Sequence, residues 1–200
     1  PPSVQRKLLA RFGSPEAVLA QPLPTVRAEF GAEVAQALAS PPPAEAVETA
    51  LAWLGGARHH LLTLADAAYP GNLLALADAP LVLYVVGDPG TLGRPAVAIV
   101  GARHATPGGL ENARAFARAL AERGLVVVSG LALGVDAAAH EGALAAEGGR
   151  TVAVIGTGAD RVYPAKHRAL AHRIAEHGAI VSEFPLGTPA QPYHFPRRNR

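Results

Sequence analysis

Cysteine is absent from the chain, and aromatic residues make up only 5% of it. The lack of cysteine excludes disulfide bonds and thiolate metal sites. No apolar run approaches the ~20 residues that a membrane-spanning helix needs, and the N-terminal segment lacks the apolar stretch and cleavage site of a secretory signal. We therefore expect a cytoplasmic protein that makes no membrane contact.

Lysine is also scarce, because only Lys7 and Lys166 accompany the arginines among the 18 basic residues. Residues 1–93 contain five basic and eight acidic residues, a net charge of −3, whereas residues 94–200 contain 13 basic and eight acidic residues, a net charge of +5. The forked donors of arginine suit phosphate groups. The basic C-terminal part favours a polyanionic partner, although a charge of this size is weak evidence taken alone.

Residues 1–57 are expected to form a small all-helical domain. The segment reads as short helices broken by proline and glycine, and Ser14 followed by Pro15 is a typical helix start. The expected helices cover residues 4–12, 14–19, 29–39 and 44–54. Four short helices with tight turns indicate a domain of the SAM or helix-hairpin-helix type.

Residues 58–200 are expected to form an α/β domain with a Rossmann-like sheet. The apolar run at 81–86 predicts a buried strand, and from Pro95 onward strands alternate with helices. The expected strands cover residues 96–100, 125–129, 151–155 and 179–182, and the expected helices cover 109–123, 134–147 and 165–177. Apolar strands that alternate with helices predict a mostly parallel sheet with helices on both faces.

Three glycine-rich loops follow the predicted strands, at residues 101–109, 129–136 and 156–161. The carboxyl ends of parallel strands meet at one edge, where such sheets bind ligands. Glycine lets the backbone approach an anion closely, and helix N-termini offer unpaired N–H groups. One such loop requires no ligand, because tight turns need glycine, but three side by side predict a phosphate pocket. Its candidate residues are Gly101, Arg103, Ser129, Gly130, Gly156 and Gly158.

The C-terminal segment carries the strongest polyanion signal, because three arginines fall within residues 197–200. Guanidinium groups pair with phosphate, and Phe195 or Tyr193 would stack on a base. The candidate residues here are Phe195, Arg197, Arg198, Asn199 and Arg200. A solvated charged tail is the simpler alternative.

No cofactor or metal site is expected. The Gly-x-Gly-x-x-Gly fingerprint of dinucleotide-binding folds is absent from the first loop, and no acidic residue closes the second strand to hold a ribose. The phosphate-binding lysine motif of nucleoside triphosphatases is absent as well.

An enzymatic alternative rests on three side chains. Asp136 and His140 stand four residues apart on one predicted helix face, and Glu183 follows the last predicted strand. They would allow acid–base chemistry, and hence a nucleotide-binding hydrolase similar to nucleoside monophosphate phosphoribohydrolases. The simpler interpretation is that Asp136 caps the helix and His140 forms a local hydrogen bond. A third hypothesis is a protein adaptor that uses the helical domain.

Short motifs of the chain stand in a recognisable order. They are Asp66–Pro70, Leu83–Gly87, Val100–Arg103, Ser129–His140, Gly156–Gly158, Tyr163-Pro164, Ser182-Glu183 and Phe195–Arg200. Their order and spacing resemble the DNA-processing protein A family, also called Smf. The resemblance covers residues 58–200 strongly and residues 1–57 loosely.

This resemblance implies an extended Rossmann fold after a small helical domain, in a non-catalytic protein that binds single-stranded DNA without sequence preference. It also implies a homodimer that protects incoming DNA and loads RecA recombinase onto it during natural transformation. The family's Gly-x-Arg position falls on Arg103, its final Arg-Asn-Arg on residues 198–200, and the basic position after Tyr-Pro near Lys166 and Arg168. Family members continue with further strands that help form the dimer and recombinase-binding surfaces. We therefore expect this chain to lack the C-terminal part of the fold.

Overall fold

A computed structural model describes residues 2–40 and 42–200. By their contacts, these residues divide into two compact units. The helical unit runs to Ala52 and includes Asn72–Leu81, and the sheet unit comprises Trp53–Gly71 and Val82–Arg200. The domain boundary that we place after residue 57 stays a prediction. Across the described residues, no helix has the length and apolar content needed to cross a membrane.

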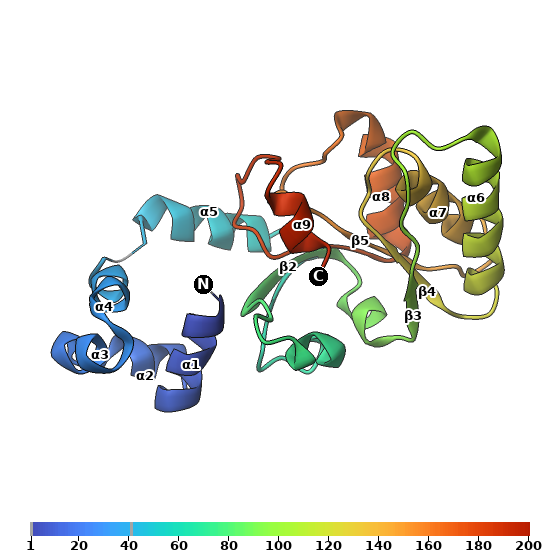
Figure 1. The fold of residues 1–200 in the computed structure, drawn as a ribbon. Helices are drawn as coiled ribbons and strands as arrows, with labels where there is room; N and C mark the ends of the chain where they lie inside the picture. Colours follow the sequence, from blue (N-terminus) through green and yellow to red (C-terminus); the bar gives the residue numbers. More distant parts are fainter. Residues whose placement is uncertain (1, 41) are drawn as a thin grey trace. The chain divides into compact units, whose positions relative to one another are not determined.

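The helical unit is built from short helices (Figure 1), the first four of which enclose a small apolar core. The helices are α1 (Pro2–Phe12), α2 (Pro15–Leu19), α3 (Leu23–Phe30), α4 (Ala32–Ala39) and α5 (Ala44–Leu54), of which α5 ends in the sheet unit. Leu8, Val18, Val26 and Ala35 are buried together. The predicted helix start at Ser14 is confirmed, because its hydroxyl accepts a hydrogen bond from the Ala17 N–H at 3.1 Å.

One helix prediction in this unit is wrong. The single helix expected at 29–39 is two helices, α3 and α4, and α3 begins earlier, at Leu23. Gly31 separates them with a φ of +93°, a backbone conformation that glycine adopts at little cost. A glycine inside an apparently continuous helical pattern therefore marked a helix end.

The sheet unit contains one six-stranded sheet in the order β1-β2-β6-β5-β4-β3. Its strands are β1 (His59–Thr63), β2 (Val82–Gly87), β3 (Ala96–Ala98), β4 (Val126–Ser129), β5 (Thr151–Val154) and β6 (Ala179–Ser182). Strands β3 to β6 are parallel, and β2 pairs antiparallel with both β1 and β6. The predicted class, an α/β protein on a mostly parallel, Rossmann-like sheet with flanking helices, is confirmed. Strand β1 was not predicted, because its run begins with two histidines and contains only two leucines.

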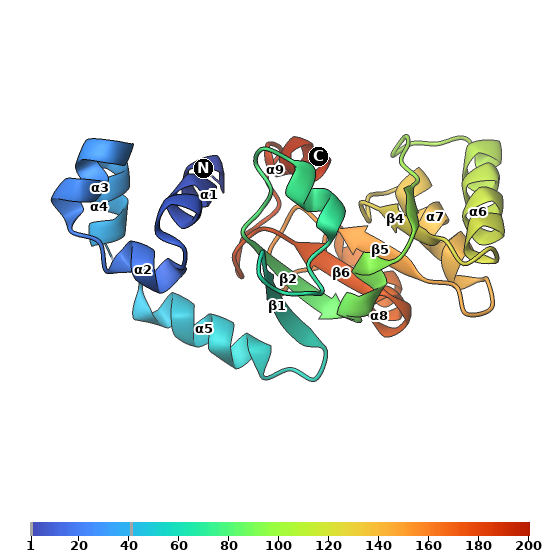
Figure 2. The same ribbon diagram turned by 90° about the horizontal axis from the view of Figure 1, so that it is seen from below.

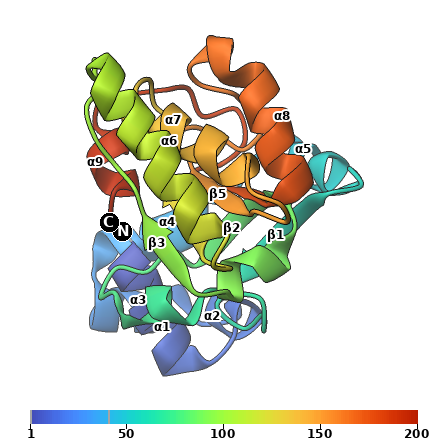
Figure 3. The same ribbon diagram turned by 90° about the vertical axis from the view of Figure 1, so that its right-hand side faces the viewer.

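Three helices connect the parallel strands and lie next to one another (Figures 2 and 3). They are α6 (Pro107–Ala121), α7 (Val135–Leu144) and α8 (Arg168–His177). Helix α7 packs against both of the others. Alanines form much of the contact between α6 and α7, among them Ala117, Ala139 and Ala143, all fully buried. Small side chains let these two helices approach closely.

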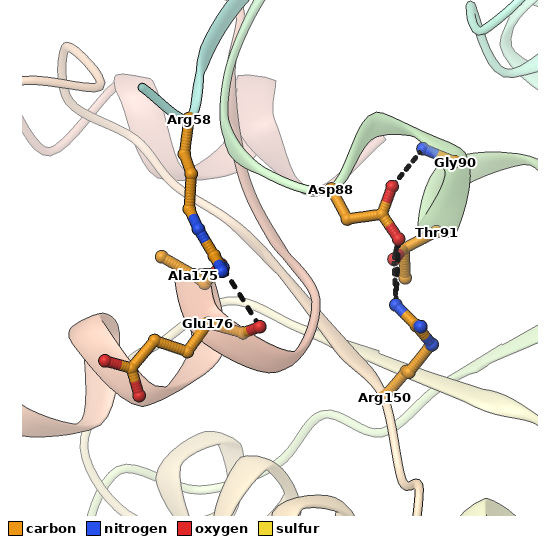
Figure 4. A network of polar contacts seen from close by, with 7 residues as sticks. All are labelled: Arg58, Asp88, Gly90, Thr91, Arg150, Ala175 and Glu176. Carbon is orange, nitrogen blue, oxygen red and sulfur yellow. Dashed lines mark hydrogen bonds and ion pairs between the residues drawn. The ribbon is translucent and has the colours of Figure 1, made fainter. Parts of the chain in front are cut away.

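The amino ends of the parallel strands are held by a polar network (Figure 4). The Asp88 carboxylate accepts hydrogen bonds from the Gly90 N–H at 2.9 Å and from the Arg150 guanidinium at 2.8 Å. Arg58, just before β1, donates to backbone carbonyls at the end of α8, at 3.0 Å for Glu176. This edge of the sheet is therefore occupied by structural contacts, and the opposite edge carries the predicted loops.

Candidate functional site

The glycine-rich loops lie together at the carboxyl edge of the sheet. The parallel register of β3, β4 and β5 places residues 99–106, 130–134 and 155–164 at this edge. A short C-terminal helix, α9 (His194–Arg198), lies against two of these loops. Sequence reasoning found its arginines but not the helix, because five residues show no usable period.

The aromatic ring of Phe195 lies at the centre of this edge. A Cβ atom added at Gly156 would stand 3.1 Å from the Phe195 ring, so the glycine lets the ring rest on the backbone. The guanidinium carbons of Arg103 and Arg198 lie 5.3 and 6.0 Å from the ring centroid, within the range of cation–π contacts. The Tyr163 ring lies 5.8 Å away. Residues up to 95 positions apart in the chain therefore meet around one ring.

Arg198 fills the space between the ends of β4 and β5. Its Nη1 group donates to the Gly130 carbonyl oxygen at 2.6 Å and also to the Val154 carbonyl oxygen. Burial lowers the pKa of the Arg198 guanidinium; the negative charge of Asp136 opposes this shift and the positive charge of Arg103 adds to it. A Cβ atom at Gly130 would overlap this guanidinium, so a side chain there would displace Arg198. One of the predicted phosphate-binding arginines is thus bound to the protein's own carbonyl groups.

The loop that ends at α7 uses its N–H groups internally. The buried Asp136 carboxylate accepts from the Gly130 N–H at 3.1 Å and from the Ala132 N–H at 3.4 Å. At Gly101 an added Cβ would come within 2.7 to 2.9 Å of the Val135 side chain. The glycines of these loops therefore make room for neighbouring side chains, and Asp136 organises the loop.

His140 lies wholly inside the protein. Its Nδ1 atom is 2.7 Å from the Thr151 hydroxyl, which donates its own hydrogen to the Val127 carbonyl at 2.6 Å, so Nδ1 carries the proton that binds Thr151. Burial lowers the pKa of His140 to about 3, and the charges of His167 and Arg198 act in the same direction. A neutral, enclosed imidazole bonded to Thr151 is not paired with Asp136. The simpler interpretation is wrong as well, because Asp136 accepts from loop N–H groups and does not cap α7, and the partner of His140 lies 11 residues away on β5.

Glu183 joins the two remaining C-terminal arginines. Its Oε2 atom accepts from Arg197 Nη2 at 2.8 Å, from Arg197 Nε at 3.1 Å and from Arg200 Nη2 at 2.6 Å. The glutamate side chain is only 9% exposed, whereas those of Arg197 and Arg200 are 44% and 22% exposed. Both guanidinium groups therefore stay partly open to solvent while they share one carboxylate.

The other predicted residues differ in their surroundings. Ser129 is buried and donates its hydroxyl hydrogen to the Ile99 carbonyl at 2.6 Å. The Gly158 N–H donates to the Thr188 carbonyl at 3.0 Å, and the Asn199 side chain accepts from Arg198 Nε at 2.8 Å. The side chains of Lys166 and Arg168 are exposed, and neither forms an ion pair within residues 2–40 and 42–200.

Two histidines of this edge were not predicted. His167 donates from Nδ1 to the Leu131 carbonyl at 2.9 Å, and His194 donates to the Gly156 carbonyl at 3.1 Å. Their neighbours along the chain give no sign of this role, because each partner is more than 30 residues away. Taken together, the carboxyl edge presents arginines, an exposed lysine and aromatic rings, an arrangement that can bind phosphates and bases.

Comparisons with known proteins point to a single family. The model of the family described as DNA recombination-mediator protein A matches residues 60–200. Protein Smf of Escherichia coli is 42% identical over 159 residues, which cover 79% of this chain and 42% of that protein. The DNA processing protein DprA of Streptococcus pneumoniae is 41% identical over 138 residues, which cover 69% of this chain and 48% of that protein. The chain spans less than half the length of these curated relatives.

Two solved structures share the fold. The X-ray structure of DNA processing protein A from Streptococcus pneumoniae superposes with a TM-score of 0.83 at 30% identity, over 100% of this chain and 68% of that chain. DNA processing protein A from Helicobacter pylori, described for its single-stranded DNA binding mode, gives a TM-score of 0.62 at 35% identity. That match covers 71% of this chain and 63% of the other.

Proposed function

This chain belongs to the DNA recombination-mediator protein A family, and from this premise we propose that it binds single-stranded DNA at the carboxyl edge of its sheet. The observation that carries the proposal is the gathering of accessible arginines at one edge, with Arg103 against the ring of Phe195 and the pair Arg197 and Arg200 beside it. Guanidinium groups bind phosphates, and aromatic rings stack on bases of any sequence. The relative from Helicobacter pylori, described for its single-stranded DNA binding mode, supports the same ligand.

The strand follows the outer rim of this edge in our proposal. Arg198 and Phe195 fill the crevice where related folds hold a phosphate, so the DNA backbone runs outside them. The phosphate contacts come from the accessible basic side chains, which are Arg103, Lys166, Arg168, Arg197 and Arg200. Of the other predicted residues, Ser129, Gly156 and Gly158 are buried, Gly130 is half-buried and Gly101 is exposed, and in our proposal they shape the loops that hold these side chains.

Fluorescence anisotropy with labelled single- and double-stranded oligonucleotides at two salt concentrations tests this proposal. We expect tighter binding of the single strand, with a log–log salt slope of about −0.7 per phosphate contacted. Arg103→Ala should weaken the binding of all single-stranded sequences about equally, and should make the salt slope shallower by the amount that roughly one phosphate contact contributes. Arg118→Ala is the matched control, because Arg118 pairs with Glu122 on the surface of α6. A folded wild-type chain that ignores both oligonucleotides at low ionic strength would overturn the proposal.

We further propose that the protein is a cytoplasmic, non-catalytic recombination accessory that acts as a homodimer. In this role it protects incoming single strands and loads RecA recombinase onto them during natural transformation. Because the chain spans less than half of its curated relatives, these activities require tests on the whole protein. Nuclease protection of a bound strand and the rate of RecA filament formation on it measure them separately.

A nucleotide hydrolase in the same site is disfavoured by two observations. The carboxylate of Glu183 is bound by two arginines, and that of Asp136 by loop N–H groups, so neither faces an open crevice. Arg198 and Phe195 occupy the space that a nucleoside monophosphate would need. We expect no release of free base from nucleoside monophosphates, and a turnover that disappears in Glu183→Gln would restore the enzymatic alternative.

A further inference from the structure

We infer that Glu183 is a positioning residue, which holds Arg197 and Arg200 as a rigid pair for neighbouring phosphate oxygens of one strand. The inference rests on the proposed function, because it concerns the same binding edge. It assigns to an acidic side chain a supporting role in binding a polyanion. A description based on charge alone would give Glu183 the opposite effect.

The first support is the geometry at one oxygen atom. Glu183 Oε2 receives all three hydrogen bonds from Arg197 and Arg200, at 2.6 to 3.1 Å. Two guanidinium groups that meet at one point repel each other unless a negative charge lies between them. The nearly buried carboxylate supplies that charge, so it sets the separation of the two cations.

A second support is the aromatic floor beneath Arg197. Its guanidinium carbon lies 5.3 Å from the centroid of the Phe184 ring, which is itself buried. The Phe184 ring packs in turn against the ring of His194, which is also buried, with 4.3 Å between the two ring centroids. Arg197 is therefore held from one side by the carboxylate and from below by a packed ring, which leaves its orientation little freedom.

The third support is the exposure that remains. Arg197 keeps 44% of its side-chain surface accessible, and its two bonds to Glu183 use only part of its N–H donors. A cation whose orientation is set before binding loses less rotamer entropy when a phosphate arrives. Pre-orientation thus favours binding even though Glu183 removes one unit of positive charge from the site.

The substitution Glu183→Gln separates the two explanations. It keeps the size of the side chain and raises the net charge of the site by one. If charge alone mattered, affinity for a single-stranded oligonucleotide would rise and the salt slope would become steeper. If Glu183 positions the arginines, we expect affinity to fall by roughly tenfold, because one or two phosphate contacts are lost. Each lost contact should make the log–log salt slope shallower by about 0.7.

Glu122→Gln is the matched control. It makes the same chemical change in a glutamate that pairs with one arginine, Arg118 at 2.8 Å, at the C-terminal end of α6 and away from the loop edge. Its affinity should stay within about twofold of the wild type, because surface charges beyond the screening length contribute little.

The experiment is anisotropy with a labelled oligothymidylate, together with thermal unfolding of each variant. A second comparison repeats Glu183→Gln in the Arg197→Ala, Arg200→Ala background, where a residue that acts only through these arginines has no further effect on affinity.

A wild-type chain that is folded but does not bind would overturn the proposed function itself. A wild-type chain that binds, with Glu183→Gln binding equally or more tightly, would overturn this inference alone. Should Glu183→Gln fail to fold, Arg197→Lys keeps the charge but loses the fork, and undiminished binding by that variant would count against the inference.

Discussion

The arginines of the carboxyl edge show how neighbouring residues of one type take different roles. Arg198 turns inward to the carbonyls of Gly130 and Val154, whereas Arg197 pairs with Glu183 and stays partly exposed. Arg103 comes from another loop and lies on the ring of Phe195. The role of each arginine is therefore determined by the partner that it contacts and not by its residue type. A substitution at Arg198 should alter the architecture of the edge, and one at Arg103 its affinity.

His140 gives a prediction at the same scale. Its pKa is about 3 in the folded protein and 6.5 in its ordinary environment, so between these pH values the unfolded chain binds more protons than the folded one. Stability from this residue is therefore complete above pH 6.5 and decreases as the pH falls toward 3, by about 1.4 kcal/mol per pH unit. Urea unfolding of the wild type and His140→Gln between pH 7 and pH 4 measures the difference.

The control for this experiment is His172→Gln, since His172 is exposed on α8. That variant should follow the wild-type pH dependence, because it leaves the buried imidazole of His140 in place. If the free energy of unfolding of the wild type and of His140→Gln changed with pH in parallel, the buried imidazole would not resist protonation.

At the scale of elements, the contact between α6 and α7 depends on the absence of side chains. A Cβ atom added at Gly142 of α7 would stand 2.9 Å from the Arg114 carbonyl carbon of α6. Alanine favours a helix over glycine by about 1 kcal/mol, but overpacking of a close contact costs about 1–3 kcal/mol. We expect Gly142→Ala to lower the free energy of unfolding by up to about 2 kcal/mol.

Chemical denaturation of Gly142→Ala beside Gly108→Ala checks this expectation. Gly108 lies in the first turn of α6, and an added Cβ there meets no atom within 4 Å. Gly108→Ala should be neutral or slightly stabilising. If both variants unfold at the same denaturant concentration, the helices do not pack as closely as the structure indicates.

Most elements of the sheet unit could be predicted because their signals are local. Apolar runs at β2, β4, β5 and β6 and the alternation with helices are visible in the sequence. Strand β1 was missed because its run begins with two histidines, and helix α9 because five residues show no helical period. Each is held by distant partners, such as β2 and the loop at Gly156. The part of α3 before Glu29 was not predicted as helix, and Gly31 was not recognised as the break that follows it.

At the scale of the whole molecule, the two edges of the sheet differ in kind. Arg150 and Asp88 form an ion pair at the amino edge (Figure 4), with 2.8 Å between the nitrogen and the oxygen. At the carboxyl edge, Lys166 and Arg168 form no ion pair within the described part of the chain. A net charge of +2 is therefore less informative than the place where basic side chains remain accessible.

This difference predicts that equal losses of charge have unequal effects. Arg150→Met should leave affinity for single-stranded DNA within about twofold at physiological salt, where charges are screened over about 8 Å. It should lower stability by at most about 1 kcal/mol, as for other partly exposed ion pairs. Arg197→Met removes the same charge at the carboxyl edge and should weaken binding several times more. Equal losses of affinity in anisotropy titrations would show that binding is not confined to one edge.

The sequence by itself determined the α/β class, the glycine-rich loops after the strands and the motifs of the family, because these depend on residues close together in the chain. Only the tertiary structure decided which arginines stay accessible. Arg198 meets Gly130 across 68 positions, and Arg200 meets Glu183 across 17. Such partners are chosen by the way the strands and α9 come together in space. The physical reason is that a hydrogen bond or ion pair depends on distance and direction, which the spacing of residues along a chain does not specify.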